Sequence, residues 1–219
     1  MQMVLPIYCA ALVVLLFLAW YYGCMAVARR RAILILRQLE LALAGEGHIT
    51  SLRWTSDSCF SASVRLGSRI FQNASMLVEM APRHFPWQWW RFARRGGEET
   101  LTFCADLDGA PGFELRVVNQ RWYGKPRRRK LLQEKDWEMV SCQRMVLSSR
   151  NEWSHEIASL VNALLATRHQ EVSRVCFGNR SPQFSATFGL QSLPLLAEQR
   201  PSVVDCLREL ARQASAHQS

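Results

Sequence analysis

The first 28 residues contain no charged side chain and no histidine, and this stretch ends at a run of three arginines. Its apolar part, residues 4–27, would extend about 36 Å as an α-helix, which is enough to cross a hydrocarbon core of about 30 Å. An aromatic triplet at residues 20–22 lies near the charged end, where such side chains prefer the headgroup layer. Residues 1–28 are therefore predicted to form a single transmembrane helix, retained as a signal-anchor.

A cleaved signal peptide is the alternative that stays open. Ala26-Val27-Ala28 has the small-x-small form of a cleavage site. A signal peptide, however, carries a basic region before a shorter apolar core, and Met1 to Met3 hold no charged side chain. The length of the apolar stretch therefore favours the anchor.

Basic residues after the anchor predict its orientation. Arg29, Arg30, Arg31 and Arg37 follow the apolar stretch closely, and no basic side chain precedes it. The positive-inside rule then places the C-terminal domain in the cytoplasm, with the anchor in the cell (inner) membrane. The chain also has seven cysteines, an odd and widely scattered set that suggests no disulfide framework and fits a reducing compartment.

A helical pattern continues beyond the anchor. Leucines and isoleucines recur at spacings of three and four until Gly45-Glu46-Gly47 (Ile33, Leu34, Leu36, Leu39, Leu41 and Leu43). Residues 29–46 are thus predicted to form a juxtamembrane amphipathic helix that packs on the domain of residues 47–219. Because no linker rich in Gly, Ser or Pro separates the two, we expect the domain to stay close to the bilayer.

The rest of the chain alternates strand-like and helical runs. Hydrophobic residues make up 49% of the chain and charged residues 21%, so there is enough apolar material for a folded core. Strands are expected at residues 48–54, 60–66, 76–80, 99–107, 113–118, 171–177 and 183–190. The turn-rich loop 108–112 predicts a hairpin of 99–107 with 113–118. With helices from Asn151 and from Ser202, the chain is predicted to be α+β, a mostly antiparallel sheet with two or three helices on one face.

Two segments of this pattern resemble each other. Phe60–Leu66 reads FSASVRL and Phe184–Leu190 reads FSATFGL, each after an expected helix and strand, with Trp54 matching Phe177. This similarity predicts a duplicated helix-strand-strand unit. The alternative is that two amphipathic hairpins look alike over seven residues.

No catalytic or metal-binding spacing occurs in the sequence. The histidines are isolated, no pair of cysteines has the CxxC spacing, and neither a GxGxxG element nor a Walker-type loop is present. We therefore expect no catalytic residue, no metal and no cofactor, and a non-enzymatic role is favoured. If the protein is a membrane-bound enzyme, Asp106, Asp108 and His84 are the candidate residues.

One segment combines tryptophan and arginine in an unusual density. Residues 83–95 read RHFPWQWWRFARR, which in composition resembles the short antimicrobial peptides of the cathelicidin and lactoferricin type. Indole rings favour the headgroup layer and guanidinium groups pair with lipid phosphates, so we expect this segment to lie at the membrane interface. The residues assigned to that interface are Trp87, Trp89, Trp90, Phe92, Arg91, Arg94 and Arg95. The alternative is that the aromatic rings belong to the core.

The charge balance points to an anionic partner. The chain has 27 Lys and Arg against 18 Asp and Glu, and a second basic run lies at residues 121–130. Anionic lipids explain this charge more simply than nucleic acid, for which no recognition motif is present. The sequence therefore predicts a single-pass membrane protein with a basic cytoplasmic binding or scaffolding domain on the inner leaflet, for which an unidentified protein partner stays open.

Overall fold

The computed structural model describes residues 4–67, 70–83, 85–109, 114–119, 138–142, 145–149 and 172–192. Within these ranges the chain forms two α-helices, nine strands and a final 3-10 turn. They are α1 (Val4–Leu43), β1 (Gly47–Ser56), β2 (Cys59–Leu66), β3 (Phe71–Glu79), α2 (Pro86–Arg94), β4 (Thr100–Leu107), β5 (Leu115–Asn119), β6 (Glu138–Cys142), β7 (Met145–Ser149), β8 (Val172–Phe177), β9 (Phe184–Gly189) and η2 (Leu190–Ser192).

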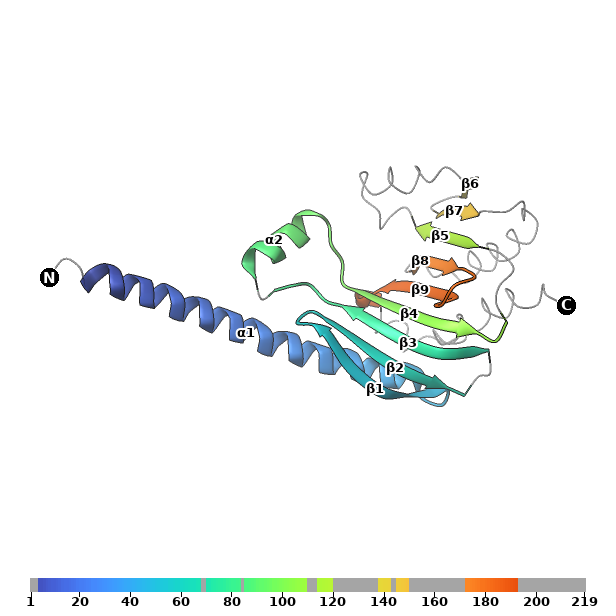
Figure 1. Cartoon of the computed structure of the whole chain (residues 1–219), viewed down its shortest axis with the longest axis horizontal. Helices are drawn as coiled ribbons and strands as arrows, with labels where there is room; N and C mark the ends of the chain where they lie inside the picture. Colours follow the sequence, from blue (N-terminus) through green and yellow to red (C-terminus); the bar gives the residue numbers. More distant parts are fainter. Residues whose placement is uncertain are drawn as a thin grey trace.

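The nine strands form one antiparallel sheet. Their order is β1-β2-β3-β4-β9-β8-β5-β7-β6, so β1 and β6 are the two edge strands (Figure 1). A long helix and a short one accompany this antiparallel sheet, which confirms the predicted α+β class. The helices expected from Asn151 and Ser202, and the basic run 121–130, lie outside the described residues.

The predicted pairing of β4 with β5 is wrong. β4 pairs with β3 and β9, whereas β5 pairs with β7 and β8. The loop after β4 contains residues that favour a turn, but turn residues do not decide which strand becomes the partner. Pairing with β9 instead places Phe103 beside Phe184, with ring centroids 6.1 Å apart, in the middle of the core.

Two strands were missed by the sequence analysis. β6 and β7 each contain five residues and pair with each other. Runs this short give a weak period-two signal, so nothing in the sequence separated them from a loop.

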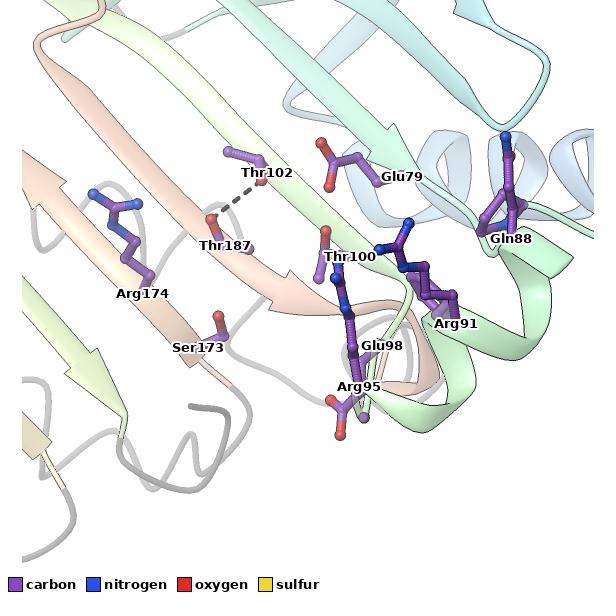
Figure 2. A pocket seen from close by; sticks show the side chains of 14 residues that line it. Glu79, Gln88, Arg91, Arg95, Glu98, Thr100, Thr102, Ser173, Arg174 and Thr187 are labelled. Atoms are coloured by element: carbon purple, nitrogen blue, oxygen red, sulfur yellow. Dashed lines mark hydrogen bonds between the residues drawn. The ribbon is translucent and has the colours of Figure 1, made fainter. Parts of the chain in front are cut away.

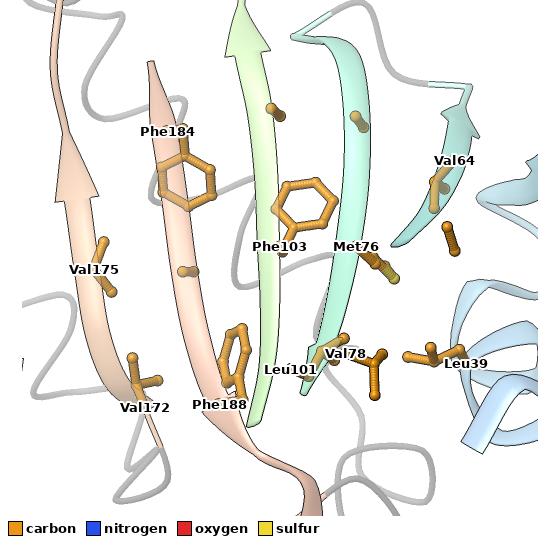
Figure 3. Packing of buried hydrophobic residues seen from close by; sticks show 14 of the residues in the cluster. Leu39, Val64, Met76, Val78, Leu101, Phe103, Val172, Val175, Phe184 and Phe188 are labelled. Atoms are coloured by element: carbon orange, nitrogen blue, oxygen red, sulfur yellow. The ribbon is translucent and has the colours of Figure 1, made fainter. Parts of the chain in front are cut away.

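One face of the sheet forms the hydrophobic core. Alternate residues of the central strands point to this face, and their aromatic rings pack together (Figure 3). Phe184 lies at the centre of the cluster, 5.0 Å from Phe177 and 5.9 Å from Phe71 between ring centroids. The opposite face of the central strands, called the open face here, carries small hydroxyl and thiol side chains that are only partly buried, as on Thr100, Thr102, Cys104, Ser185, Thr187 and Cys176.

The apolar anchor and the juxtamembrane segment form one unbroken helix. α1 runs for 40 residues and ends at Leu43, where Gly45 takes the left-handed conformation with φ of 87°. That conformation suits glycine and closes the helix, with the N–H of Glu46 donating to the carbonyl of Leu43 over 3.0 Å.

The face with which α1 packs on the sheet differs from the expected one. Ala32, Ile35, Leu39 and Leu43 are buried against the core, whereas Ile33, Leu34 and Leu41 are exposed. Apolar side chains lie on all sides of this part of the helix, so their periodicity alone did not identify the side that packs on the sheet. The small side chain of Ala32 allows close approach, and the buried residues follow the four-residue ridge of a helix.

The two similar hairpins have the same register. Trp54 faces Phe60 in the first and Phe177 faces Phe184 in the second, with ring centroids 5.4 and 5.0 Å apart. In each hairpin the pairing shifts at the same point, between Ile49 and Ser51 and between Val172 and Arg174. A shared irregularity in addition to a shared sequence supports duplication of the strand-strand part of the unit.

Candidate membrane interface

The N-terminal half of α1 is apolar and uncovered. From residue 7 to residue 28 no described side chain is buried, and the helix is long and apolar enough to span a membrane. The exposed side chains of this half include Leu12, Val13, Leu15, Leu16, Phe17, Trp20 and Val27. This region therefore lacks the packing that the second half of the same helix makes with the sheet.

The tryptophan- and arginine-rich segment folds into α2. Phe85 precedes the helix and Pro86 occupies its first turn, where the missing N–H costs little. At the other end Gly96 donates to the carbonyl of Ala93 over 3.0 Å and Gly97 to that of Phe92 over 2.9 Å. These two bonds form a Schellman motif, so α2 is closed at its C-terminus by hydrogen bonds from its own chain.

Glycine is required at position 97. A side-chain carbon there would lie only 2.7 Å from the ring of Phe92. The ring therefore packs directly on the backbone of the turn after α2, which holds the helix to the start of β4.

The two sides of α2 differ in chemistry. At 100° per residue, Trp87, Trp89 and Trp90 lie on one side of the helix, and Arg91, Phe92 and Arg95 lie on the other. The tryptophans are exposed, with 63% of Trp87 accessible to solvent. Trp87 and Trp90 stack at 5.0 Å between ring centroids, and the Arg94 guanidinium lies 4.4 Å from the centroid of the Trp90 ring. The tryptophans thus form an exposed aromatic surface and are not part of the core.

An aromatic contact joins α2 to the apolar half of α1. The Phe85 ring lies 6.4 Å from Phe17 and 6.3 Å from Tyr21, measured between centroids. In Figure 1, α2 stands away from the sheet in the direction of the N-terminal half of α1. The start of α2 therefore lies against the apolar half of α1.

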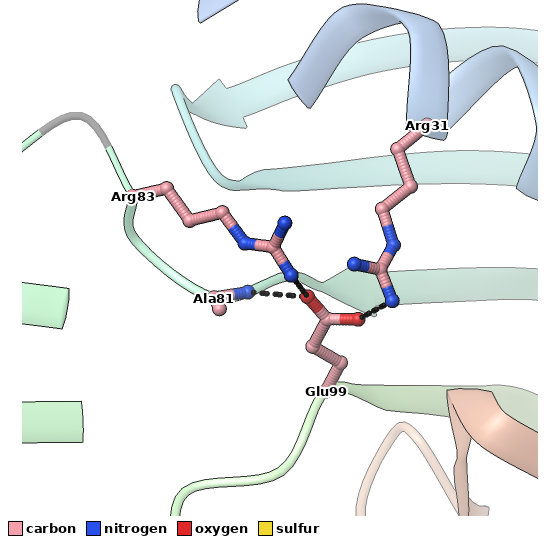
Figure 4. Close-up of polar contacts among 4 residues, drawn as sticks. All are labelled: Arg31, Ala81, Arg83 and Glu99. Atoms are coloured by element: carbon pink, nitrogen blue, oxygen red, sulfur yellow. Dashed lines mark hydrogen bonds and ion pairs between the residues drawn. The ribbon is translucent and has the colours of Figure 1, made fainter. Parts of the chain in front are cut away.

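Glu99 binds three segments together at the base of α2. Its carboxylate accepts from Arg31 of α1 over 2.6 Å, lies 3.6 Å from Arg83, and accepts from the backbone N–H of Ala81 over 3.2 Å (Figure 4). The Glu99 side chain is only 10% exposed. This cluster holds α1, the loop before α2 and the loop after it in one arrangement.

A groove lies between α2 and the open face of the sheet. It encloses about 540 Å³, and Figure 2 shows its walls. α2 contributes Gln88, Arg91, Phe92 and Arg95, and the strands contribute Glu79, Thr100, Thr102, Ser173, Arg174 and Thr187. The groove therefore combines several cations and hydroxyl groups on the side of α2 that faces away from the tryptophans.

The structure divides the predicted interface residues into two groups. Trp87, Trp89, Trp90 and Arg94 are exposed and lie on the outer side of α2. Phe92 is half-buried, and Arg91 and Arg95 line the groove. Among the flanking arginines, Arg29 and Arg30 are exposed whereas Arg31 is paired with Glu99.

The sequence analysis missed Phe85 and Glu99 as parts of this region. Phe85 was read as one more aromatic residue of the segment, and Glu99 as an end of a strand. The pair Gly96-Gly97 was a signal that a helix ends within this region, because two glycines after an amphipathic run indicate a helix end.

The structure does not bring the enzymatic candidates to the groove. Asp106 lies six residues after Thr100 on β4, which corresponds to about 20 Å along a strand. Asp106 accepts from Asn73 over 3.2 Å, and Asp108 accepts from Gln72 over 2.8 Å. Hydrogen bonds from Ser181, Asn73 and Gln183 lower the pKa of Asp106, so this carboxylate stays ionised. His84 lies outside the described residues.

Thiols and metal ligands offer no further site in the described ranges. Burial raises the pKa of Cys104, and the nearby Cys176 raises it further; burial and then Glu79 raise the pKa of Cys59. Such thiols are poor nucleophiles at neutral pH. No group of three His, Cys, Asp or Glu side chains there could hold a metal ion.

Comparison with known proteins gives no further indication of function. Neither a protein-family model nor a curated protein sequence matches this chain.

Proposed function

We propose that this chain is a single-pass membrane protein whose basic α+β domain is a binding or scaffolding module held against the anionic inner leaflet of the cell membrane. The observation that carries the proposal is the contact of Phe85 with Phe17 and Tyr21. It brings the start of α2, the helix that carries the exposed tryptophans, to the apolar half of α1. Two elements of one chain thereby offer aromatic side chains to the same headgroup layer.

The level of α2 along α1 suggests where the bilayer ends. The aromatic residues of α1 (Trp20, Tyr21 and Tyr22) lie at the level of Phe85. A boundary there leaves Val4–Tyr22, about 28 Å of helix, for the hydrocarbon core. Arg29 and Arg30 then stand about 10 Å beyond the boundary, where their long side chains reach lipid phosphates.

The amphipathic character of α2 supports its role as the second membrane contact. Its tryptophan side faces outward and Arg94 stacks on Trp90, so a cation and an aromatic ring lie on one surface. A domain already tethered by α1 meets the bilayer at a high effective concentration, and a weak contact through α2 is then well populated.

Vesicle binding by a shortened chain tests this contact separately from the anchor. The chain should begin at Arg29, because the α1 residues that pack on the sheet start at Ala32. We expect it to bind vesicles containing phosphatidylglycerol, to bind phosphatidylcholine vesicles less, and to lose affinity as salt screens the arginines over about 8 Å.

Replacing the three tryptophans of α2 by alanine should weaken this binding and leave the melting temperature nearly unchanged, because the rings are exposed. Trp54→Ala is the matched control, since Trp54 is similarly exposed but lies on β1. The proposal fails if the triple variant binds vesicles as well as the parent chain, or if it unfolds.

A further inference from the structure

The groove behind α2 has the composition of an anion site. Arg91 and Arg95 lie one helical turn apart and both project into the groove, toward Thr100 (Figure 2). Among the described residues neither guanidinium group has an ion-pair partner, although Arg31 and Arg83 pair with Glu99 and Arg94 stacks on Trp90. Guanidinium groups that converge without a carboxylate partner are suited to an incoming anion.

The opposite wall of the groove supplies hydroxyl groups. Thr100 and Thr102 come from β4 and Thr187 from β9, all on the open face of the sheet. The hydroxyls of Thr102 and Thr187 lie 3.1 Å apart and hydrogen-bond to each other, so one of them keeps a proton available for a further acceptor. Hydroxyl donors beside guanidinium groups match an anion with several oxygen atoms.

Two glutamates also line the groove, but among the described residues neither forms an ion pair with Arg91 or Arg95. Glu79 lies on β3 as the cross-strand neighbour of Thr100, and Figure 2 shows the Glu98 carboxylate directed away from Arg91 and Arg95. With Arg174 on β8, the groove has three arginines against two glutamates. Its volume of about 540 Å³ is in the usual range for small-molecule sites and leaves room for more than a bare ion.

We propose that this groove binds a phosphate ester, with Arg91 and Arg95 holding the phosphate oxygens and the threonine hydroxyls of β4 and β9 donating to them. The inference rests on the binding role proposed above, but not on membrane contact by the tryptophans, because the groove lies on the other side of α2. The ester can come from a soluble metabolite or from a lipid headgroup, which carry the same phosphate chemistry.

Calorimetric titration of the full chain in a maltoside detergent, which contains no phosphate, tests the proposal. The probes are inorganic phosphate, glycerol 3-phosphate, and phosphatidic acid in mixed micelles. We expect saturable binding of at least one probe. The double variant R91K/R95K keeps the charge but loses the planar fork, and should weaken that binding at least about tenfold.

Two further variants make the result specific. R53K is the matched control, because Arg53 is an exposed arginine of β1 that does not line the groove, and its affinity should equal that of the parent chain. Thr102→Val keeps the shape of the side chain and removes its hydroxyl, so it should weaken binding severalfold even if R91K/R95K proves unstable.

Each outcome decides one point. Binding of glycerol 3-phosphate identifies a soluble ester, and binding of phosphatidic acid alone identifies a headgroup. The inference is wrong if no probe binds, if R91K/R95K and Thr102→Val bind as the parent does, or if R53K loses as much affinity as R91K/R95K. Vesicle binding that is lost in the tryptophan variant while the groove still binds its probe rejects only the membrane contact.

Discussion

The Arg31 guanidinium lies 2.6 Å from the Glu99 carboxylate, so the helix that leaves the apolar span is joined directly to the loop between α2 and β4. The same carboxylate also receives Arg83 and the backbone of Ala81. Arg31 was predicted as one of the basic residues that flank the apolar span, and in the structure it also pairs with Glu99. The position of α2 beside α1 depends on this pair as well as on Phe85.

Removing the carboxylate charge should loosen this junction. Glu99→Gln leaves Arg31 and Arg83 without their ion pair, and because Arg31 is 40% exposed the cost should be about 1–2 kcal/mol of unfolding free energy. Chemical denaturation of the full chain in detergent measures it. A double-mutant cycle with Arg31→Gln should show a coupling energy; additive single effects would mean that the pair contributes nothing.

A side-chain carbon at position 97 should disturb the end of α2. Gly97→Ala pushes on the Phe92 ring at 2.7 Å and should destabilise the helix by about 1–2 kcal/mol. Hydrogen exchange of the α2 amides should become faster while the sheet amides stay protected. Gly178→Ala is the control, because nothing lies within 4 Å of the added carbon; equal effects in both variants would contradict the packing described for Phe92.

Equivalent positions of the two hairpins should respond differently to the same change. Phe177 is 3% exposed, and Phe177→Ala should cost about 3–5 kcal/mol of unfolding free energy. Trp54 holds the matching position but is 42% exposed, so Trp54→Ala should cost about 1 kcal/mol. Denaturation midpoints of the two variants compare these costs, and a Trp54 variant as unstable as the Phe177 variant would show that Trp54 is covered.

The orientation of the anchor predicts the location of the C-terminus. Basic residues follow the apolar span and none precedes it, so a C-terminal fusion should fluoresce as a cytoplasmic reporter and lack activity as an alkaline phosphatase. The protein should also keep its N-terminal residues in the membrane fraction after carbonate washing. Phosphatase activity would reverse the orientation, and a soluble chain beginning at Arg29 would identify a signal peptide.

Local pattern predicted most of the strands but not their partners. Phe60–Leu66 alternates strictly between apolar and polar residues, and β2 occupies the same residues apart from one. The pairing of β4 with β9 joins segments far apart in the chain, and it depends on how Phe103 and Phe184 pack. Packing between distant segments leaves no trace in the pattern of either one.

The candidate site was predicted by composition and resolved only by geometry. The sequence indicated that residues 83–95 combine aromatic rings with cations, and the exposed tryptophans agree with a surface role. It could not assign Arg91 and Arg95 to the groove, because that depends on the Gly96-Gly97 turn through which α2 joins β4. The role of Phe85 in joining α2 to α1 could be assigned only from its contact with Tyr21 in the structure.

If the apolar half of α1 spans a bilayer, the unbroken course of α1 couples the tilt of that span to the position of the sheet. The helix has no hinge between the apolar span and Leu43, and its far end is fixed to the sheet by buried residues. About 30 Å of helix separate Tyr22 from Leu43, so a change in tilt of about 10° displaces the far end by about 5 Å. A span of fixed length tilts to match the thickness of its bilayer. The angle between the sheet and the membrane plane would then change with the local thickness of the bilayer.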